Sequence, residues 1–137
     1  ATLTLSSADL TGDALALSTT ATLTKGNSST GLDQTFGVNR KTYTATSEVV
    51  LFDEVDFGAA SDPAHKVYIR NTSTSASEYV TIKLGDGVGD ANAQELGRIY
   101  GGDWMFIPYS AAADTDITVT PSVSSALTLE YMAIYHS

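Results

Sequence analysis

Few side chains in this sequence can do chemistry near neutral pH. It contains two histidines, His65 and His136, and no cysteine. Nucleophilic catalysis needs a nucleophile held beside a base, and a third group that orients the base. His136 is the penultimate residue, His65 follows Pro63 in a predicted loop, and no Gly-x-Ser-x-Gly motif is present. We therefore predict that the protein is not an enzyme and expect no catalytic residue.

A glycine-rich segment, Gly85-Asp-Gly-Val-Gly89, follows a predicted strand. Phosphate-binding loops use such glycines, but their spacing differs, and they continue into a helix that this sequence does not predict. Asp86, Asp90 and Glu95 offer oxygen ligands for a hard cation, yet the neighbouring residues do not complete an EF-hand loop. We interpret the segment as a surface turn and expect no cofactor and no metal, with adventitious calcium as the alternative.

An aromatic cluster is the other candidate site. Trp104 lies near Tyr100, Phe106 and Tyr109, and aromatic faces of this kind can stack on the apolar side of sugar rings. A tryptophan in an alternating strand is more often part of a core, and Pro108 ends the run as a strand boundary would. We expect Trp104 in the core, with Phe106 on the same strand face. A sugar-binding platform is the alternative.

Composition excludes several classes of partner. The formal net charge is −9, so nucleic acids and anionic membranes, which are polyanions, would be repelled. No apolar run approaches the roughly 20 residues that span a bilayer, and the N-terminus does not read as a signal peptide. A start at Ala1 fits removal of an initiator methionine in a cytoplasm. The acceptor patterns at Asn27 and Asn71 are then expected to mark turns only.

The elements that must position these residues are predicted to be strands. Apolar and polar residues alternate with a period of two, and helical periodicity is nearly absent. The alternating runs are 67–70, 80–84, 117–120 and 127–135. The last run has Leu127, Leu129, Tyr131 and Tyr135 on one face and Met132 and Ile134 on the other. Such a strand is central, or has its outer face covered by a partner.

The remaining segments complete an all-β pattern. Residues 97–109 are predicted to form a hairpin around Gly101-Gly102-Asp103, and residues 40–52 one longer strand. Only 90–96 invites a helix, and it is seven residues long. Turn residues recur between short strands, which is typical of a β-sandwich or jelly roll.

The two ends of the chain differ in composition. Of the aromatic residues, only Phe36 and Tyr43 precede residue 48, and residues 1–47 have balanced charges, so residues 48–137 carry the whole net charge. Too few large side chains lie in 1–47 to build a core. We predict an extended N-terminal arm over 1–47, ordered by the body or by a neighbouring subunit, and a β-sandwich body over 48–137. An ordinary pair of edge strands is the alternative for the arm.

The body resembles small structural virion proteins of marine tailed phages, cyanophages among them. The resemblance covers about half the chain and rests on the segments Val67-Tyr-Ile-Arg-Asn-Thr-Ser-Thr, Glu78-Tyr-Val-Thr-Ile-Lys-Leu-Gly, Leu96-Gly-Arg-Ile-Tyr-Gly-Gly-Asp-Trp-Met-Phe-Ile-Pro-Tyr and Leu127-Thr-Leu-Glu-Tyr-Met. It implies many symmetric copies, no catalysis and a location in the virion. It identifies no individual binding residue.

These observations together predict a structural component of a phage particle. The expected role is a capsid decoration or cement protein, a homotrimer that binds the major capsid protein and bridges neighbouring capsid subunits. A minor tail or head-fibre component is the first alternative, and a carbohydrate-binding module the second.

Overall fold

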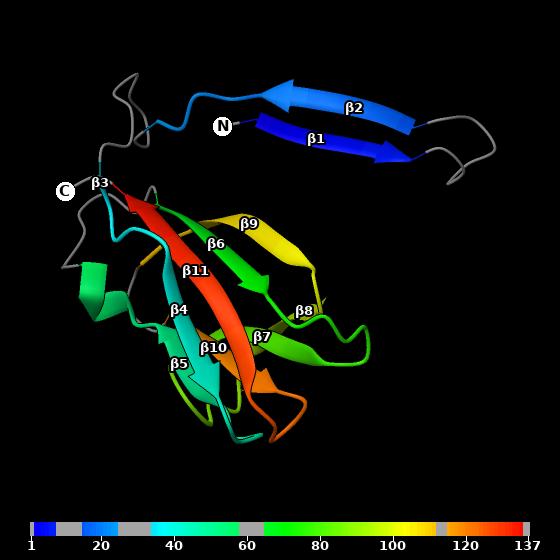
Figure 1. Ribbon diagram of the computed structural model, residues 1–137. Coiled ribbons are helices and arrows are strands. Elements are labelled where there is room, and N and C mark those ends of the chain that lie inside the picture. Colours follow the sequence, from blue (N-terminus) through cyan, green and yellow to red (C-terminus); the bar gives the residue numbers. More distant parts are fainter. Residues whose placement is uncertain (1, 8–14, 25–33, 58–64, 112–114, 136–137) are drawn as a thin grey trace.

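A computed structural model describes residues 2–7, 15–24, 34–57, 65–111 and 115–135. Within these ranges the chain forms eleven strands and one short 3₁₀ helix, Glu54–Phe57, and every strand pairing is antiparallel (Figure 1). No helix in the described part of the chain is long and apolar enough to cross a membrane. The predicted all-β class is confirmed.

Two sheets pack face to face as a sandwich. The first contains, in spatial order, β5 (Val49–Phe52), β10 (Asp116–Pro121), β7 (Tyr79–Gly85) and β8 (Gln94–Tyr100). The second contains β11 (Leu127–Tyr135), β6 (His65–Asn71) and β9 (Trp104–Tyr109), with β3 (Gln34–Thr35) and β4 (Asn39–Tyr43) on the far side of β11. Since β3 and β4 pair with successive parts of β11, they share one position at that edge.

The strand pairings are nested along the chain. β4 pairs with β11, β5 with β10, β6 with β9 and β7 with β8. Folding a chain into such nested pairs and wrapping them over two sheets gives the eight-stranded jelly roll, one of the two architectures that the turn pattern predicted.

The core lies between the sheets and follows the alternation of the sequence. The large aliphatic side chains that are at most 1% exposed come from four strands: Val67, Ile69, Val80, Ile82, Ile117, Val119, Leu127 and Leu129. Successive side chains of a strand point to opposite faces, so each alternating run contributes one row to this layer. The prediction that 127–135 is a central strand is confirmed, because β11 lies between β4 and β6.

The prediction of one long strand over 40–52 is wrong. Residues 39–43 and 49–52 belong to opposite sheets, and residues 44–48 connect them. Tyr43 is buried in the core, where burial raises the pKa of its hydroxyl to about 12. β4 is therefore part of the body although it precedes residue 48, and the predicted boundary at residue 47 does not separate two structural units.

The predicted hairpin over 97–109 is also wrong, although both of its strands exist. β8 pairs with β7 in one sheet and β9 pairs with β6 in the other, so the turn at 101–103 is an arch between sheets. Backbone bonds hold the arch to the end of β6: Asn71 N donates to Asp103 O (3.0 Å) and Gly102 N donates to Asn71 O (3.0 Å). A Cβ at Gly101 would collide with the backbone of Ser75, so the arch requires glycine there.

Residues 90–96 form no helix. Asp90 closes a turn, because its carboxylate accepts the backbone N–H groups of Asp86 (3.0 Å) and Asn92 (2.8 Å), and β8 begins at Gln94. These two hydrogen bonds lower the pKa of Asp90. Competition by an aspartate side chain for local backbone groups is the usual reason that such a segment turns and does not continue as a helix.

A two-stranded hairpin stands apart from both sheets. It consists of β1 (Thr2–Ser7) and β2 (Leu15–Thr20), whose strands pair only with each other within the described residues. Figure 1 shows it above the upper end of the sandwich, over the side on which β6, β9 and β11 lie. Among the described residues of the predicted arm, the two strands of this hairpin belong to neither sheet of the body.

Candidate functional site

The hairpin has one face on which leucines gather. Leu5 lies opposite Leu17, and Leu3 opposite Thr19, so these leucines share a face with Thr19, while the other face carries only threonine, serine and alanine. Leu3, Leu5 and Leu17 are 37–47% exposed. An isolated two-stranded hairpin is marginally stable in water, so a surface of this kind needs a partner.

The second sheet has an apolar patch on its outer face. We call the outward side chains of β6, β9 and β11 that form it the aromatic patch: Tyr68, Trp104, Phe106, Met132 and Ile134. They are contiguous across the strands, because Tyr68 lies opposite both Phe106 and Met132. The Trp104 and Tyr68 ring centroids are 6.4 Å apart at an interplanar angle of 38°.

The prediction that Trp104 is in the core is wrong, since the residue is 50% exposed. In β9 the side chains of Met105, Ile107 and the buried Tyr109 point into the core. Because successive side chains of a strand point to opposite faces, Trp104 and Phe106 point outward. Phe106 does share the face of Trp104, as expected, but that face is the outer one.

A cleft of about 530 Å³ separates the hairpin from the aromatic patch. The hairpin side is lined by Thr2, Leu3 and Thr19, together with Ala21 and Leu23 just after β2, and the sheet side by the whole aromatic patch. Volumes of this size suit small ligands or protruding side chains. The cleft thus has one wall from the N-terminal hairpin segment and one, largely apolar, from the second sheet of the body.

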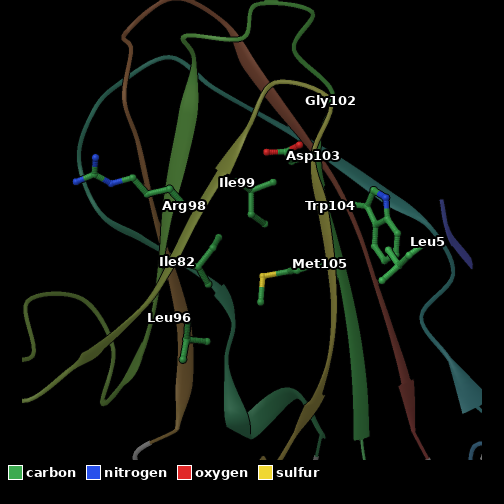
Figure 2. A pocket seen from close by; sticks show the side chains of 10 residues that line it. Leu5, Ile82, Leu96, Arg98, Ile99, Gly102, Asp103, Trp104 and Met105 are labelled. Carbon is green, nitrogen blue, oxygen red and sulfur yellow. The ribbon is translucent and has the colours of Figure 1, made fainter. Parts of the chain in front are cut away.

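A second cavity of about 510 Å³ opens between the edge strands β8 and β9. Figure 2 shows Ile82, Ile99 and Met105 between these strands, and Leu5 of the hairpin beside Trp104. Leu96, which is 47% exposed, also lines it. The sandwich is therefore not closed on the side nearest the hairpin.

The charge around the aromatic patch is opposite to that of the chain as a whole. The outward positions of β4, β6, β9 and β11 carry Arg40, Lys66 and Arg70 but only one acid, Glu130. Glu130 pairs with Arg40 at 2.8 Å. This face of a protein with net charge −9 is locally basic and apolar.

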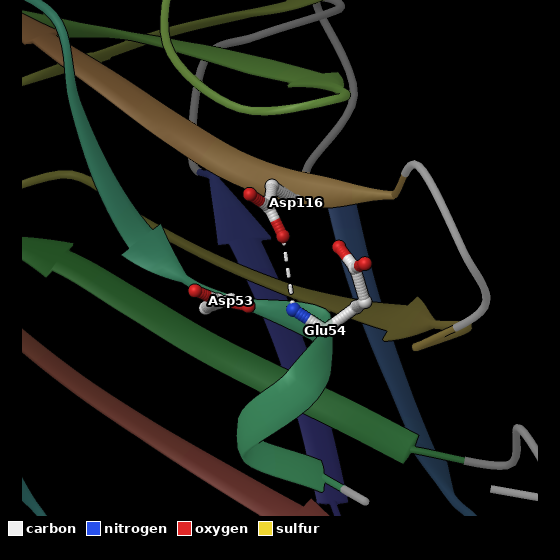
Figure 3. A group of neighbouring side chains, drawn as sticks. All are labelled: Asp53, Glu54 and Asp116. Carbon is white, nitrogen blue, oxygen red and sulfur yellow. Dashed lines mark hydrogen bonds between the residues drawn. The ribbon is translucent and has the colours of Figure 1, made fainter. Parts of the chain in front are cut away.

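An acidic trio lies at one end of the first sheet, shown in Figure 3. Carboxylate oxygens of Asp53, Glu54 and Asp116 lie within 4.8 Å of one another, and Asp116 Oδ1 accepts the Glu54 N–H at 2.9 Å. The pKa of Glu54 is raised, first by a hydrogen bond to the Asp116 carboxyl and then by burial and neighbouring acids. By chemistry the three carboxylates could hold a hard cation.

No sequence pattern indicates this trio. Asp53 and Glu54 follow β5, and Asp116 begins β10, so only the pairing of those strands brings them together. Asp86, Asp90 and Glu95, considered as ligands only in the alternative of adventitious calcium, do not form such a group within the described residues. The carboxylate of Asp90 is used to close its own turn.

The other sequence motifs acquire structural roles. The segment 85–89 is a turn, as predicted, with Gly87 and Gly89 at φ 79° and 82°. Asn71 is fully buried, and its side chain donates to Glu78 O and Ile99 O, so it cannot carry a glycan. His65 begins β6, whereas Asn27 and His136 lie outside the described residues.

Comparison with known proteins identifies no family. No protein-family description matches the sequence, and no curated protein matches it. Among solved structures, the chain is similar to the Yersinia pseudotuberculosis-derived mitogen (YPM), with 16% sequence identity and a TM-score of 0.47 over 76% of this chain and 87% of that one. A likeness this distant carries no argument about what the present chain does.

Proposed function

We propose that this protein is a structural component of a phage virion, a capsid decoration protein that works as an oligomer, expected to be a trimer. The observation that carries the proposal is the pair of apolar surfaces outside the core: the leucine face of the hairpin and the aromatic patch. Large exposed apolar surfaces mark sites of protein interaction.

The mechanism would be stabilisation by mass action. A protein that binds only the assembled lattice stabilises that lattice in proportion to its affinity and concentration. Several linked copies multiply a weak contact with the capsid, because each further binding event becomes intramolecular. The jelly roll occurs in viral capsid proteins and in lectins, so the fold supports this proposal by analogy only.

The test requires particles of the phage that encodes the chain. Mass spectrometry should find the protein in purified particles at a fixed ratio to the major capsid protein, and cryo-electron microscopy should place it on the outer surface of the head. Density on the tail or on head fibres would favour the first alternative. Absence from the particles would overturn the proposal.

A carbohydrate-binding function is the second candidate. The half-exposed Trp104 beside Tyr68 favours it, because exposed aromatic faces bind the apolar side of sugar rings. A glycan array with the purified protein tests this function. Binding that Trp104→Phe retains and Trp104→Ala loses would support it, and an array without signal would exclude it for the sugars tested.

A further inference from the structure

We propose that the aromatic patch receives the leucine face of the hairpin from a second copy of this chain, so that copies exchange hairpins within a closed ring. This inference rests on the proposed function only in its requirement for an oligomer. It adds which surfaces make the contact between copies.

The first argument is that the two surfaces face each other without closing. Packed protein interiors leave few voids larger than a water molecule, whereas the cleft here has about 530 Å³. Trp104 remains 50% exposed, and Leu3 and Leu5 remain 37% and 44% exposed. The contact within one chain is therefore incomplete for both of the surfaces that make it.

The second argument is that the hairpin can fill only one kind of site. The leucines of the hairpin lie on a single face. If a second hairpin entered the cleft between this leucine face and the aromatic patch, the threonine and serine face of the second hairpin would be buried against one of these two surfaces. A close contact requires the leucine face directly on an aromatic patch. When the chain's own hairpin leaves its patch open, the leucine face of another copy is the matching surface.

The third argument concerns charge. The strands of the hairpin, residues 2–7 and 15–20, contain no charged residue, the segment 8–14 between them in the sequence contains Asp9 and Asp13, and the chain as a whole carries −9. Two bodies of net negative charge repel each other, but a hairpin whose strands are uncharged, joined by a segment with the acids Asp9 and Asp13, is not repelled by the locally basic face around Lys66 and Arg70. The hairpin is thus the part of a second copy whose docking meets the smallest electrostatic repulsion.

The exchange uses one hairpin and one patch per copy. Such a contact joins two different surfaces, so each copy can bind the next one in the same way. The copies form a closed ring if the rotation from one copy to the next adds up to a full turn, and a filament if it does not. A closed ring leaves neither surface exposed, which matches a soluble decoration subunit.

Cysteine cross-linking tests the exchange, because the chain has no cysteine of its own. Leu3→Cys protein is mixed in urea with C-terminally tagged Met132→Cys protein, and the mixture is refolded and oxidised. Both residues line the cleft, and a disulfide between two different chains can form only in trans. The matched control is Thr4→Cys, one residue away on the opposite hairpin face.

We expect a tagged–untagged dimer on a non-reducing gel, at least about fivefold more abundant with Leu3→Cys than with Thr4→Cys. Circular dichroism of each reduced variant verifies folding. In a second arm, the double variant L3C/M132C is oxidised alone. An internal disulfide in a monomer, without dimers in the mixture, would show that the hairpin closes on its own sheet and would overturn the proposal. Equal yields from both hairpin positions would overturn it as well. Since no capsid is present, these outcomes are independent of the virion test.

Discussion

At the scale of single residues, the candidate binding surface depends on which way Trp104 points. Trp104, Met105 and Phe106 follow one another in one strand, so both faces of that strand carry apolar side chains. A strand that is apolar on both faces does not reveal by periodicity which face is buried. The decision comes from Met105 and Ile107, which pack against the core and leave the indole outside.

The position of Trp104 leads to a stability prediction. Trp104→Ala should lower the free energy of unfolding by less than about 1 kcal/mol, because the side chain is half exposed. Ile69→Ala, on the neighbouring strand β6, should cost about 2–5 kcal/mol because Ile69 is fully buried. Urea unfolding measures both. A loss for Trp104→Ala as large as that for Ile69→Ala would place the indole in the core after all.

Glu48 leads to a prediction about pH. Its carboxylate accepts hydrogen bonds from Thr118 Oγ1 (2.7 Å) and Gly89 N (3.2 Å) and lies 3.4 Å from Lys83 Nζ. These contacts, the Thr118 bond first, lower the pKa of Glu48 from 4.5. A lowered pKa stabilises the fold above pH 4.5, and this contribution is lost as the pH falls through the folded-state value.

Glu48→Gln should therefore lower the melting temperature at about pH 7, and the difference from wild type should shrink as the pH falls below about 4. Glu95→Gln is the matched control, because Glu95 is exposed and lies 3.8 Å from Arg98 in an exposed pair. Thermal unfolding at several pH values measures both variants. A difference that stays constant down to low pH would mean that Glu48 acts through packing and not through its charge.

At the scale of elements, the N-terminal forty-seven residues divide into two parts with different roles. β4 completes the edge of the second sheet beside β11 and contributes the buried Tyr43, whereas β1 and β2 pair only with each other within the described residues. Composition averaged over residues 1–47 does not separate these parts, because the segment as a whole has balanced charges and only two aromatic residues, Phe36 and Tyr43.

Two truncations separate the roles of these elements. Deleting residues 1–24 should leave the circular dichroism spectrum and the melting temperature of the body close to wild type, since no strand of the sandwich is lost, and should abolish oligomerisation. Deleting residues 1–47 should also lower stability strongly, because it removes β4 and exposes the edge of β11. If both truncations melted alike, β4 would contribute nothing to the body.

At the scale of the whole molecule, the net negative charge lies in residues 48–137, and the strands of the hairpin carry no charge. Thirteen acids and four bases lie in residues 48–137, whereas the strands of the hairpin have neither and the segment 8–14 between them in the sequence has two acids, Asp9 and Asp13. Exposed charges are screened over about 8 Å at physiological salt, so repulsion between bodies weakens as salt rises while an apolar contact persists. Self-association should therefore depend weakly on salt and survive high salt.

Sedimentation velocity across a salt series measures this dependence. Trp104→Ala, in the same series, should associate more weakly than wild type at every salt concentration because its patch is smaller. A steep loss of association with added salt would indicate that attraction between the acidic loops and the basic residues near the patch holds the copies together, and the hairpin-centred contact would be wrong.

The sequence alone determined the local structure of this protein. Alternation with a period of two predicted the strands at 67–70, 80–84, 117–120 and 127–135, and their inward rows form the observed core. It also predicted the turn at 85–89. These features depend on residues close together in the chain, whose side-chain directions follow from strand geometry.

Strand pairing, and the choice of which face of a strand is buried, depend on contacts between distant parts of the chain. The turn at Gly101–Asp103 suits a hairpin and an arch equally, and the hydrogen bonds to Asn71, thirty positions earlier, select the arch. The acidic trio likewise exists because β5 pairs with β10, and the cleft because the hairpin lies over β6, β9 and β11. Such contacts join residues far apart in sequence, so no local pattern encodes them, and the surfaces proposed to bind a partner belong to this class.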